Sequence, residues 1–279
     1  MRRTCVAAVL AAMMATPTQA FGTVTIGSNL GRVPTVTTGC DPSCTRVGAS
    51  LAPTAVAPGG LASPVNGTVV TWRIRIGSST APATFRVVRR FPGDLASGAG
   101  TSATVTPAIQ SINAFATRLP IAIGDWIGVD CCVGGGGVIG VSGVSGRTDL
   151  WLPALADGAE PRARFQYGPQ DMFETAINAD IEPTATLGSV KAKPKKGGKI
   201  KVTMIAPNPG TLFATGKGLH SSPRKEVPAA GPFTLVVKPY FVAKRKLAKG
   251  KKVKVKLKLT FTPTGGEAAV QTVKVKLKR

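Results

Sequence analysis

Lysine alternates with an aliphatic residue over residues 252–259, which read Lys-Val-Lys-Val-Lys-Leu-Lys-Leu. A period of two matches a β-strand, in which successive side chains point to opposite faces, and does not match a helix. Residues 273–278 repeat the pattern, and a turn-forming segment, 263–267, separates the two runs. We expect an antiparallel hairpin with both aliphatic rows buried and both lysine rows on one outer face. The lysines of this face are Lys252, Lys254, Lys256, Lys258, Lys274, Lys276 and Lys278.

The basic residues divide the chain into two parts of different composition. The first lysine is Lys191, and residues 184–279 carry 20 Lys and 3 Arg against 2 Glu, which gives +21. Residues 21–183 contain 11 Arg and 11 acidic residues and are neutral. Nearly all of the formal net charge of +23 therefore belongs to the last third of the chain. We expect a domain boundary near residue 184.

The first twenty residues have the order of a secretory signal peptide. Arg2 and Arg3 precede an apolar stretch at 5–15, and small residues follow, so that cleavage is expected after Ala20. The apolar stretch is too short to span a bilayer, and no later apolar run has the required length. We expect an extracellular protein without a transmembrane anchor, associated with the cell surface if it is retained.

Four cysteines remain after removal of the signal: Cys40, Cys44, Cys131 and Cys132. Export favours disulfides, and the Asp-Pro-Ser segment between Cys40 and Cys44 favours a turn that brings these two together. Cys131 and Cys132 would then form a vicinal disulfide or stay reduced. Cross-linking of the two pairs is the alternative, and a zinc site is the least favoured one because export favours oxidation.

Short β-type runs separated by turn residues fill both parts of the chain, so we predict an all-β protein. In 21–183 we expect strands at 22–26, 68–76, 84–91, 102–106, 112–119, 126–132, 138–144, 164–167 and 177–181, and one short helix at 170–177. In 184–279 we expect strands at 186–192, 199–205, 211–218, 233–240, 252–262 and 268–277. Strand number and length favour a jelly-roll-like β-sandwich followed by a smaller immunoglobulin- or fibronectin-like β-sandwich.

Residues suited to catalysis are scarce. The only histidine is His220, which disfavours His-based catalysis and most zinc hydrolases. The acidic residues of 21–183 are scattered without a recognisable catalytic spacing, and the glycine run at 134–137 lacks the pattern of a phosphate-binding loop. We therefore expect a non-enzymatic protein with no cofactor and no metal site.

Two features of the first part suggest binding. Trp151 lies two residues before Pro153 and is the best candidate for an exposed aromatic that stacks on a sugar, which gives the alternative of a carbohydrate-binding module. Arg73, Arg75 and Arg86 lie on the polar face of alternating runs. They form either a guanidinium patch for an anionic ligand or, the favoured interpretation, a solvated sheet face.

The lysine rows have two explanations. Lysines on outer faces and edges of sheets prevent aggregation, and we favour this solubility role somewhat over binding. Binding to an anionic cell-wall polymer or an acidic polysaccharide is the other explanation. Specific nucleic-acid binding is disfavoured by the export signal and by the absence of stacking aromatics among the lysines.

Stretches of both parts carry a family resemblance. Residues 63–73, 119–128 and 177–183 resemble segments of exported proteins of high-GC actinobacteria. A second set resembles a lysine-rich sandwich module that is appended to various exported proteins, and it comprises residues 195–202, 207–212 and 262–266. The resemblance implies a two-domain β fold and an extracellular compartment. It implies no reaction and no functional residues, because these groups have no assigned activity.

Overall fold

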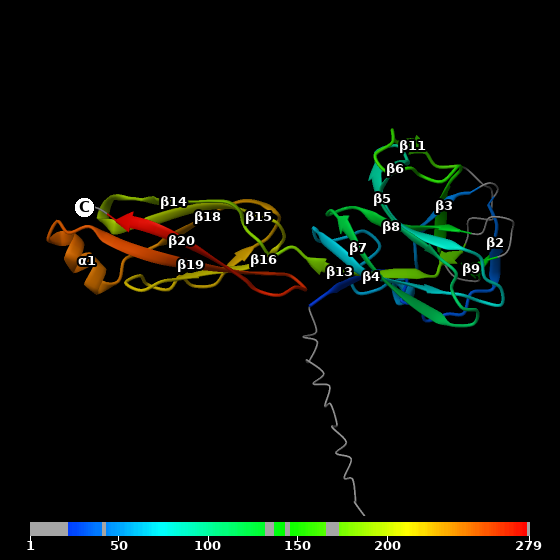
Figure 1. The fold of residues 1–279 in the computed structure, drawn as a ribbon, viewed down its shortest axis with the longest axis horizontal. Helices are drawn as coiled ribbons and strands as arrows, with labels where there is room; N and C mark the ends of the chain where they lie inside the picture. The colour runs from blue at the N-terminus through cyan, green and yellow to red at the C-terminus, as the bar shows by residue number, and fades with distance from the viewer. Residues whose placement is uncertain (1–21, 41–42, 132–136, 143–145, 166–172, 278–279) are drawn as a thin grey trace, which may run out of the picture.

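The computed structural model describes residues 22–40, 43–131, 137–142, 146–165 and 173–277. These residues form antiparallel β-sheets, with one α-helix and short 3-10 turns (Figure 1). The predicted all-β fold class is confirmed. The expected signal peptide at 1–20 lies outside the described residues.

The N-terminal part contains two main sheets and one small sheet, ordered β1-β13-β4-β7, β10-β3-β8-β5-β6-β11 and β12-β9-β2. Trp72 on β4 stacks on Phe85 of β5, with 5.4 Å between ring centroids, and so joins the two main sheets. Buried residues from both sheets surround this pair. The strands are β1 Val24–Gly27, β2 Val36–Thr38, β3 Thr45–Ser50, β4 Gly67–Arg75, β5 Ala83–Phe91, β6 Leu95–Val105, β7 Ile112–Ile121, β8 Trp126–Cys131, β9 Gly137–Val141, β10 Arg147–Trp151, β11 Arg162–Ala163, β12 Glu174–Thr175 and β13 Ile177–Pro183.

The helix predicted at 170–177 is wrong where the structure describes it. Residues 174–175 form β12, which pairs with β9, and residue 177 begins β13. Strand β13 lies between β1 and β4, and it buries Ile177, Ala179 and Ile181 in the core. Pairing on both sides and burial outweigh the weak helical preference of this segment. The sequence did not indicate β3 and β10. In the six-stranded sheet β10 is an edge strand and β3 lies next to it.

The C-terminal part is a seven-stranded sandwich of the sheets β14-β15-β18 and β17-β16-β19-β20. Its buried core includes Val202 and Leu235 from the first sheet and Leu212, Leu257 and Phe261 from the second. Three strands against four, with every partner antiparallel, is an immunoglobulin-like arrangement. The elements are β14 Gly188–Pro194, β15 Ile200–Ala206, β16 Gly210–Thr215, β17 Lys225–Val227, β18 Gly231–Val237, α1 Phe241–Ala248, β19 Val253–Pro263 and β20 Ala269–Leu277.

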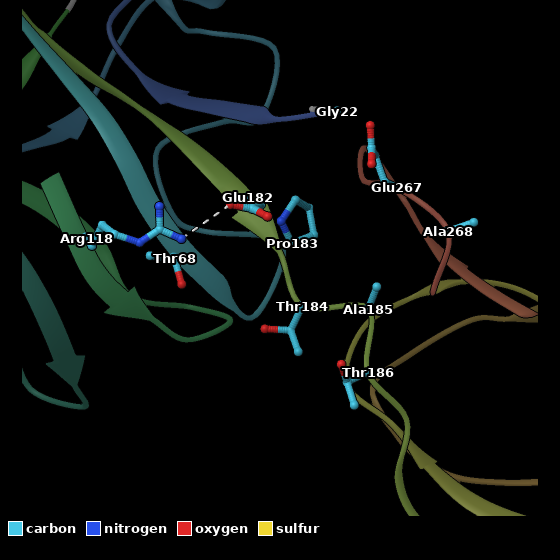
Figure 2. A pocket seen from close by; sticks show the side chains of 10 residues that line it. All are labelled: Gly22, Thr68, Arg118, Glu182, Pro183, Thr184, Ala185, Thr186, Glu267 and Ala268. Carbon is cyan, nitrogen blue, oxygen red and sulfur yellow. Dashed lines mark ion pairs between the residues drawn. The ribbon is translucent and has the colours of Figure 1, made fainter. Parts of the chain in front are cut away.

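The hydrophobic cores of the two parts share no residue. Between these cores, the hydrogen bonds of one buried asparagine connect the N-terminal and C-terminal parts. The fully buried Asn208 donates to the carbonyl oxygens of Asn66 (2.9 Å) and Thr184 (2.7 Å) and accepts from the Asn66 backbone N–H (2.6 Å). Beside this contact, a hollow of about 310 Å³ opens between the end of β13 and the β19–β20 turn (Figure 2). Arg118 and Glu182 form an ion pair at 3.9 Å on the side of the hollow that belongs to the N-terminal part.

We predict that Asn208→Ala lowers the free energy of unfolding by about 1–3 kcal/mol, because it removes three part-buried hydrogen bonds at the junction of the two parts of the chain. Chemical denaturation of the full chain measures this change. Thr186→Ala is the control: Thr186 lies in the connection between β13 and β14, two residues after Thr184, and is exposed, so its change is expected to stay within about 0.5 kcal/mol. Equal effects of the two variants would contradict the role given to Asn208.

Candidate functional site

The lysine hairpin forms as the sequence predicts. Strands β19 and β20 pair so that Lys254 lies opposite Lys276 and Lys256 lies opposite Lys274. The intervening aliphatic residues, among them the fully buried Leu257, face the core. The register therefore puts two rows of lysines on the outer face of the four-stranded sheet.

We call the exposed lysines of this hairpin the lysine face. Its members within the strands are Lys254, Lys256, Lys258, Lys274 and Lys276. Lys252 is exposed just before β19 begins, and Lys278 lies outside the described residues. Lysines of one row are about 7 Å apart along the strand, because every second residue points outward. A hollow of about 420 Å³ lies between the two rows, lined by Lys254, Lys256, Lys274 and Lys276 together with Val255 and Val275.

Among the described residues, no carboxylate forms an ion pair with the lysine face. Every ion pair found in the described part of the chain uses an arginine, and none uses a lysine. The C-terminal part, residues 184–279, has two acidic residues, Glu226 and Glu267. Glu226 lies on β17, at the sheet edge opposite β20, and Glu267 lies in the β19–β20 turn. The positive charge of the face is therefore available to an external anion.

The arginines of the N-terminal part have internal partners instead. Arg73 pairs with Asp180 at 2.5 Å, and Arg86 pairs with Asp130 at 2.5 Å. Arg75 donates to the backbone oxygen of Leu30 at 2.7 Å. Carboxylates therefore neutralise Arg73 and Arg86, and of the anion patch expected at Arg73, Arg75 and Arg86 only Arg75 has no acidic partner among the ion pairs of the described residues.

Trp151 is buried, so the expectation that it is exposed is wrong. Its side chain is 1% exposed, its ring Nε1 donates to the Arg162 backbone oxygen (3.0 Å), and the Arg90 guanidinium lies 5.7 Å from the ring centroid. The cause is long-range: β10 pairs with β3, and the chain after Pro153 returns along the same sheet in β11. Sugar stacking needs an open ring face. The carbohydrate-binding alternative thus loses the residue on which it rested.

Asp149 is the centre of a buried ion-pair network near Trp151. The fully buried carboxylate contacts the guanidinium groups of Arg90, Arg147 (3.1 Å) and Arg164 (3.4 Å). Arg90 also lies over the ring of Trp126, 4.8 Å from its centroid. An unpaired charge here would be costly, so these residues are best understood as support for the large sheet.

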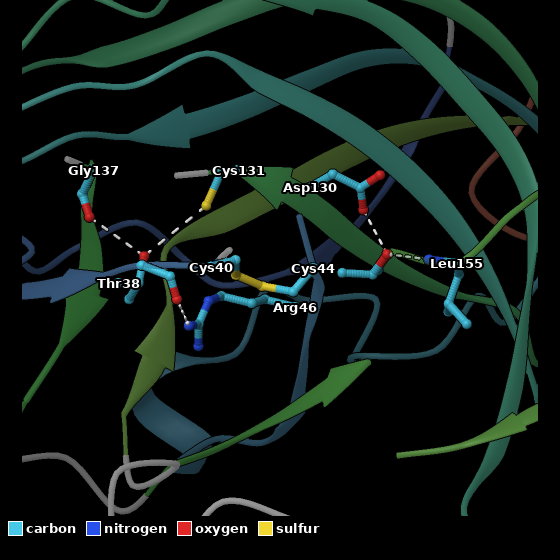
Figure 3. The surroundings of a disulfide bond; sticks show 10 residues. Thr38, Cys40, Cys44, Arg46, Asp130, Cys131, Gly137 and Leu155 are labelled. Atoms are coloured by element: carbon cyan, nitrogen blue, oxygen red, sulfur yellow. Dashed lines mark hydrogen bonds between the residues drawn. A yellow bond between two sulfur atoms is a disulfide. The ribbon is translucent and has the colours of Figure 1, made fainter. Parts of the chain in front are cut away.

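Cys40 and Cys44 form a disulfide, with 5.6 Å between their Cα atoms (Figure 3). This is the pairing that the sequence favours. Cys131 is also disulfide-bonded, and it lies beside Thr38, 3.9 Å from the threonine hydroxyl. Cys132 lies outside the described residues. The described residues contain no group of three or more His, Cys, Asp or Glu side chains arranged to hold a metal ion.

Two carboxyl groups of the N-terminal part are perturbed by burial. Burial raises the pKa of Asp130 above its ordinary value, although hydrogen bonds from Thr45 and Arg86 oppose the shift. Burial likewise raises the pKa of Glu174, against a hydrogen bond from Ser28. The two acids lie on β8 and β12, in different sheets, and both accept hydrogen bonds from neighbouring strands or connections.

Helix α1 is the surface feature that sequence reasoning missed. Residues 238–240 separate it from β18, and it begins just after the strand predicted at 233–240, in a segment for which no element was predicted. The signal was present: Ala243 and Leu247 are four residues apart and both are buried, and Gly250 ends the helix with a φ of 73°. The density of lysine and arginine around these residues obscured that pattern.

Comparison with known proteins adds no family assignment, because no protein-family model and no curated protein matches the chain. The resemblance to exported actinobacterial proteins stays a prediction. No helix in the described ranges combines the length and the apolar character that crossing a bilayer requires.

We predict that the contribution of Asp180 to stability depends on pH. Burial by itself raises the pKa of Asp180, but hydrogen bonds from Arg73 and Thr25 outweigh burial and lower it below the ordinary 3.8. A lowered pKa means that the ionised carboxylate stabilises the fold above pH 3.8, and that this is lost as the pH falls through the folded-state value. Asp180→Asn should therefore cost about 1–2 kcal/mol at neutral pH.

Denaturant titrations of the wild type and Asp180→Asn across the acidic range measure this difference. The gap between the two proteins should close below pH 3.8. A gap that is constant with pH would show that the ion pair with Arg73 is not its source.

We also predict that the facing lysines cost stability. Lys256→Glu replaces a repulsion with Lys274 by an attraction, so it should raise the free energy of unfolding by about 0.5 kcal/mol at low salt. The gain should shrink at high salt because the interaction is screened. Lys258→Glu is the matched control, since it changes the same charge on the same face but lies opposite Thr272. Equal gains in both variants would refute the pairwise repulsion.

Proposed function

We propose that the protein acts outside the cell as a non-enzymatic binding protein whose lysine face engages an anionic surface polymer, such as a cell-wall polymer or an acidic polysaccharide. The observation that carries this proposal is the pairing of like charges across the hairpin without any carboxylate partner. Facing lysines destabilise a hairpin, and an external polyanion would remove that cost on binding.

The two parts of the chain treat their charges differently, which supports binding over solubility alone. Most arginines of the N-terminal part form ion pairs with acidic residues, many of them half-buried or buried. Lys254, Lys256, Lys274 and Lys276 project from strand positions, and each of them lies opposite another lysine. Solubility requires only scattered charge. Two aligned rows with a regular spacing of about 7 Å suit a linear polymer that carries repeated negative groups.

Binding of a fluorescent heparin and of polygalacturonate to the full chain tests the proposal. The face variant has four lysines of the hairpin replaced by glutamine, namely Lys254, Lys256, Lys274 and Lys276. The matched control has the same change at four exposed lysines that lie outside the strands and face no other lysine in a strand pair, namely Lys195, Lys196, Lys199 and Lys217. Both variants lose the same net charge.

We expect the face variant to bind at least about tenfold more weakly than the wild type, with a shallower dependence of affinity on salt. The control should stay within about threefold of the wild type, because it leaves the lysine face intact. Equal losses in the two variants would show that net charge alone drives adsorption. Failure of the wild type to bind either polymer at low salt would overturn the proposal.

A further inference from the structure

Three consecutive apolar residues project from the surface where α1 begins. Tyr240 is 50% exposed, Phe241 67% and Val242 55%. Phe241 is the most exposed large hydrophobic residue in the described part of the chain. Single exposed apolar residues are common on soluble proteins, whereas contiguous ones indicate a contact surface.

The fold holds these residues outward. On the opposite side of α1, Ala243 and Leu247 are buried, and Leu247 packs close against Gly198. At the other end of the helix, Gly250 donates its N–H to the oxygen of Leu247 (3.0 Å) and Lys251 donates to that of Lys246 (3.1 Å). This pair of bonds is a Schellman ending, which fixes where the helix stops. The exposure of Phe241 and Val242 is thus a property of an anchored helix.

Positive charge surrounds the apolar residues. Residues 238–252 contain seven basic residues and no acidic one: Lys238, Lys244, Arg245, Lys246, Lys249, Lys251 and Lys252. Four of these line a hollow of about 280 Å³ together with Phe241 and Val242, namely Arg245, Lys246, Lys249 and Lys251. We call the exposed residues 240–242, together with Arg245, Lys246, Lys249 and Lys251, the α1 tip.

The α1 tip lies at the end of the molecule that is farthest from the N-terminal part (Figure 1). Strands β19 and β20 run lengthwise between this end and the junction. A flat surface can therefore approach the α1 tip without meeting the N-terminal part.

We propose that the α1 tip docks on an anionic lipid bilayer, with Tyr240, Phe241 and Val242 in the interfacial layer and the cations on headgroup phosphates. Aromatic and apolar side chains with a basic surround are the combination that interfacial membrane elements use. A second copy of the α1 tip is a poor partner, because both surfaces would carry the same strong positive charge. This inference rests on the exposed apolar residues and is independent of the polymer proposed for the lysine face.

Sedimentation with vesicles tests the docking. The probes are vesicles of phosphatidylcholine alone and of phosphatidylcholine mixed with phosphatidylglycerol. The tip variant, Phe241→Ser with Val242→Ser, removes apolar area without changing charge. The matched control is Ile205→Ser with Val270→Ser, which removes two exposed apolar residues from β15 and β20. All four positions are exposed, so the variants should fold, and thermal unfolding verifies this.

We expect the wild type to sediment with the anionic vesicles and not with the neutral ones. The tip variant should bind at least about tenfold more weakly, and the control should stay within about twofold of the wild type. Equal binding of the tip variant and the control would overturn the proposal, because it would reduce the contact to charge alone. Binding of the wild type to neither vesicle would overturn it as well.

Insertion is tested directly with Phe241→Trp. Lipids brominated in their acyl chains should quench the added fluorescence of Trp relative to the wild type, whose own three tryptophans lie in the N-terminal part, with Trp72 and Trp151 buried and Trp126 partly buried. Absence of added quenching at saturating vesicles would contradict insertion. The tip variant should still bind heparin like the wild type. Loss of membrane docking can therefore be told apart from loss of polymer binding by the lysine face.

Discussion

Alternation of side chains across an antiparallel sheet is the constraint on which the rest of this protein depends. Each strand of a sandwich has one buried face, so every second residue must point outward and be compatible with water. In β19 the inward positions include Val255, Leu257 and Phe261, which fill the C-terminal core. The outward positions are then fixed by register, and the pairing of β19 with β20 brings lysines face to face. Burial of the aliphatic rows thus makes the lysine side chains of both strands point outward on the same face of the sheet.

The two parts of the chain use different basic residues at their outward positions: arginine in the N-terminal part and mostly lysine in the C-terminal part. Arginine presents several donors in a planar fork, which suits half-buried pairs such as Arg73 with Asp180 and Arg89 with Asp125. Lysine is a flexible, strongly hydrated point charge that remains exposed at low cost. A neutral arginine-only part and a lysine-rich part therefore differ in how their charge is used: the first uses it within the fold, and the second presents it to solvent.

Sequence reasoning succeeded where the pattern was local and regular. The hairpin of β19 and β20, its outward lysines and the Cys40–Cys44 pairing each follow from neighbouring residues. It failed where distant segments decide the environment. Trp151 is buried because β10 pairs with β3, about a hundred residues earlier in the chain, and the segment 174–183 is extended because β9, β1 and β4 pair with it. Helix α1 was missed because its two buried residues stand among many cations.

The placement of charge along β19 and β20 argues against a uniform solubility coat. Outward residues near α1 are lysines, such as Lys254 and Lys276, whereas Thr260 and Thr262 take the outward positions toward the N-terminal part. If the lysines only prevented aggregation, we would expect them at outward positions along the whole strand. The charge instead increases toward the end that carries the exposed Phe241. The lysine face and the α1 tip therefore share one end of the C-terminal sandwich, and a protein attached there would extend its N-terminal part away from the surface.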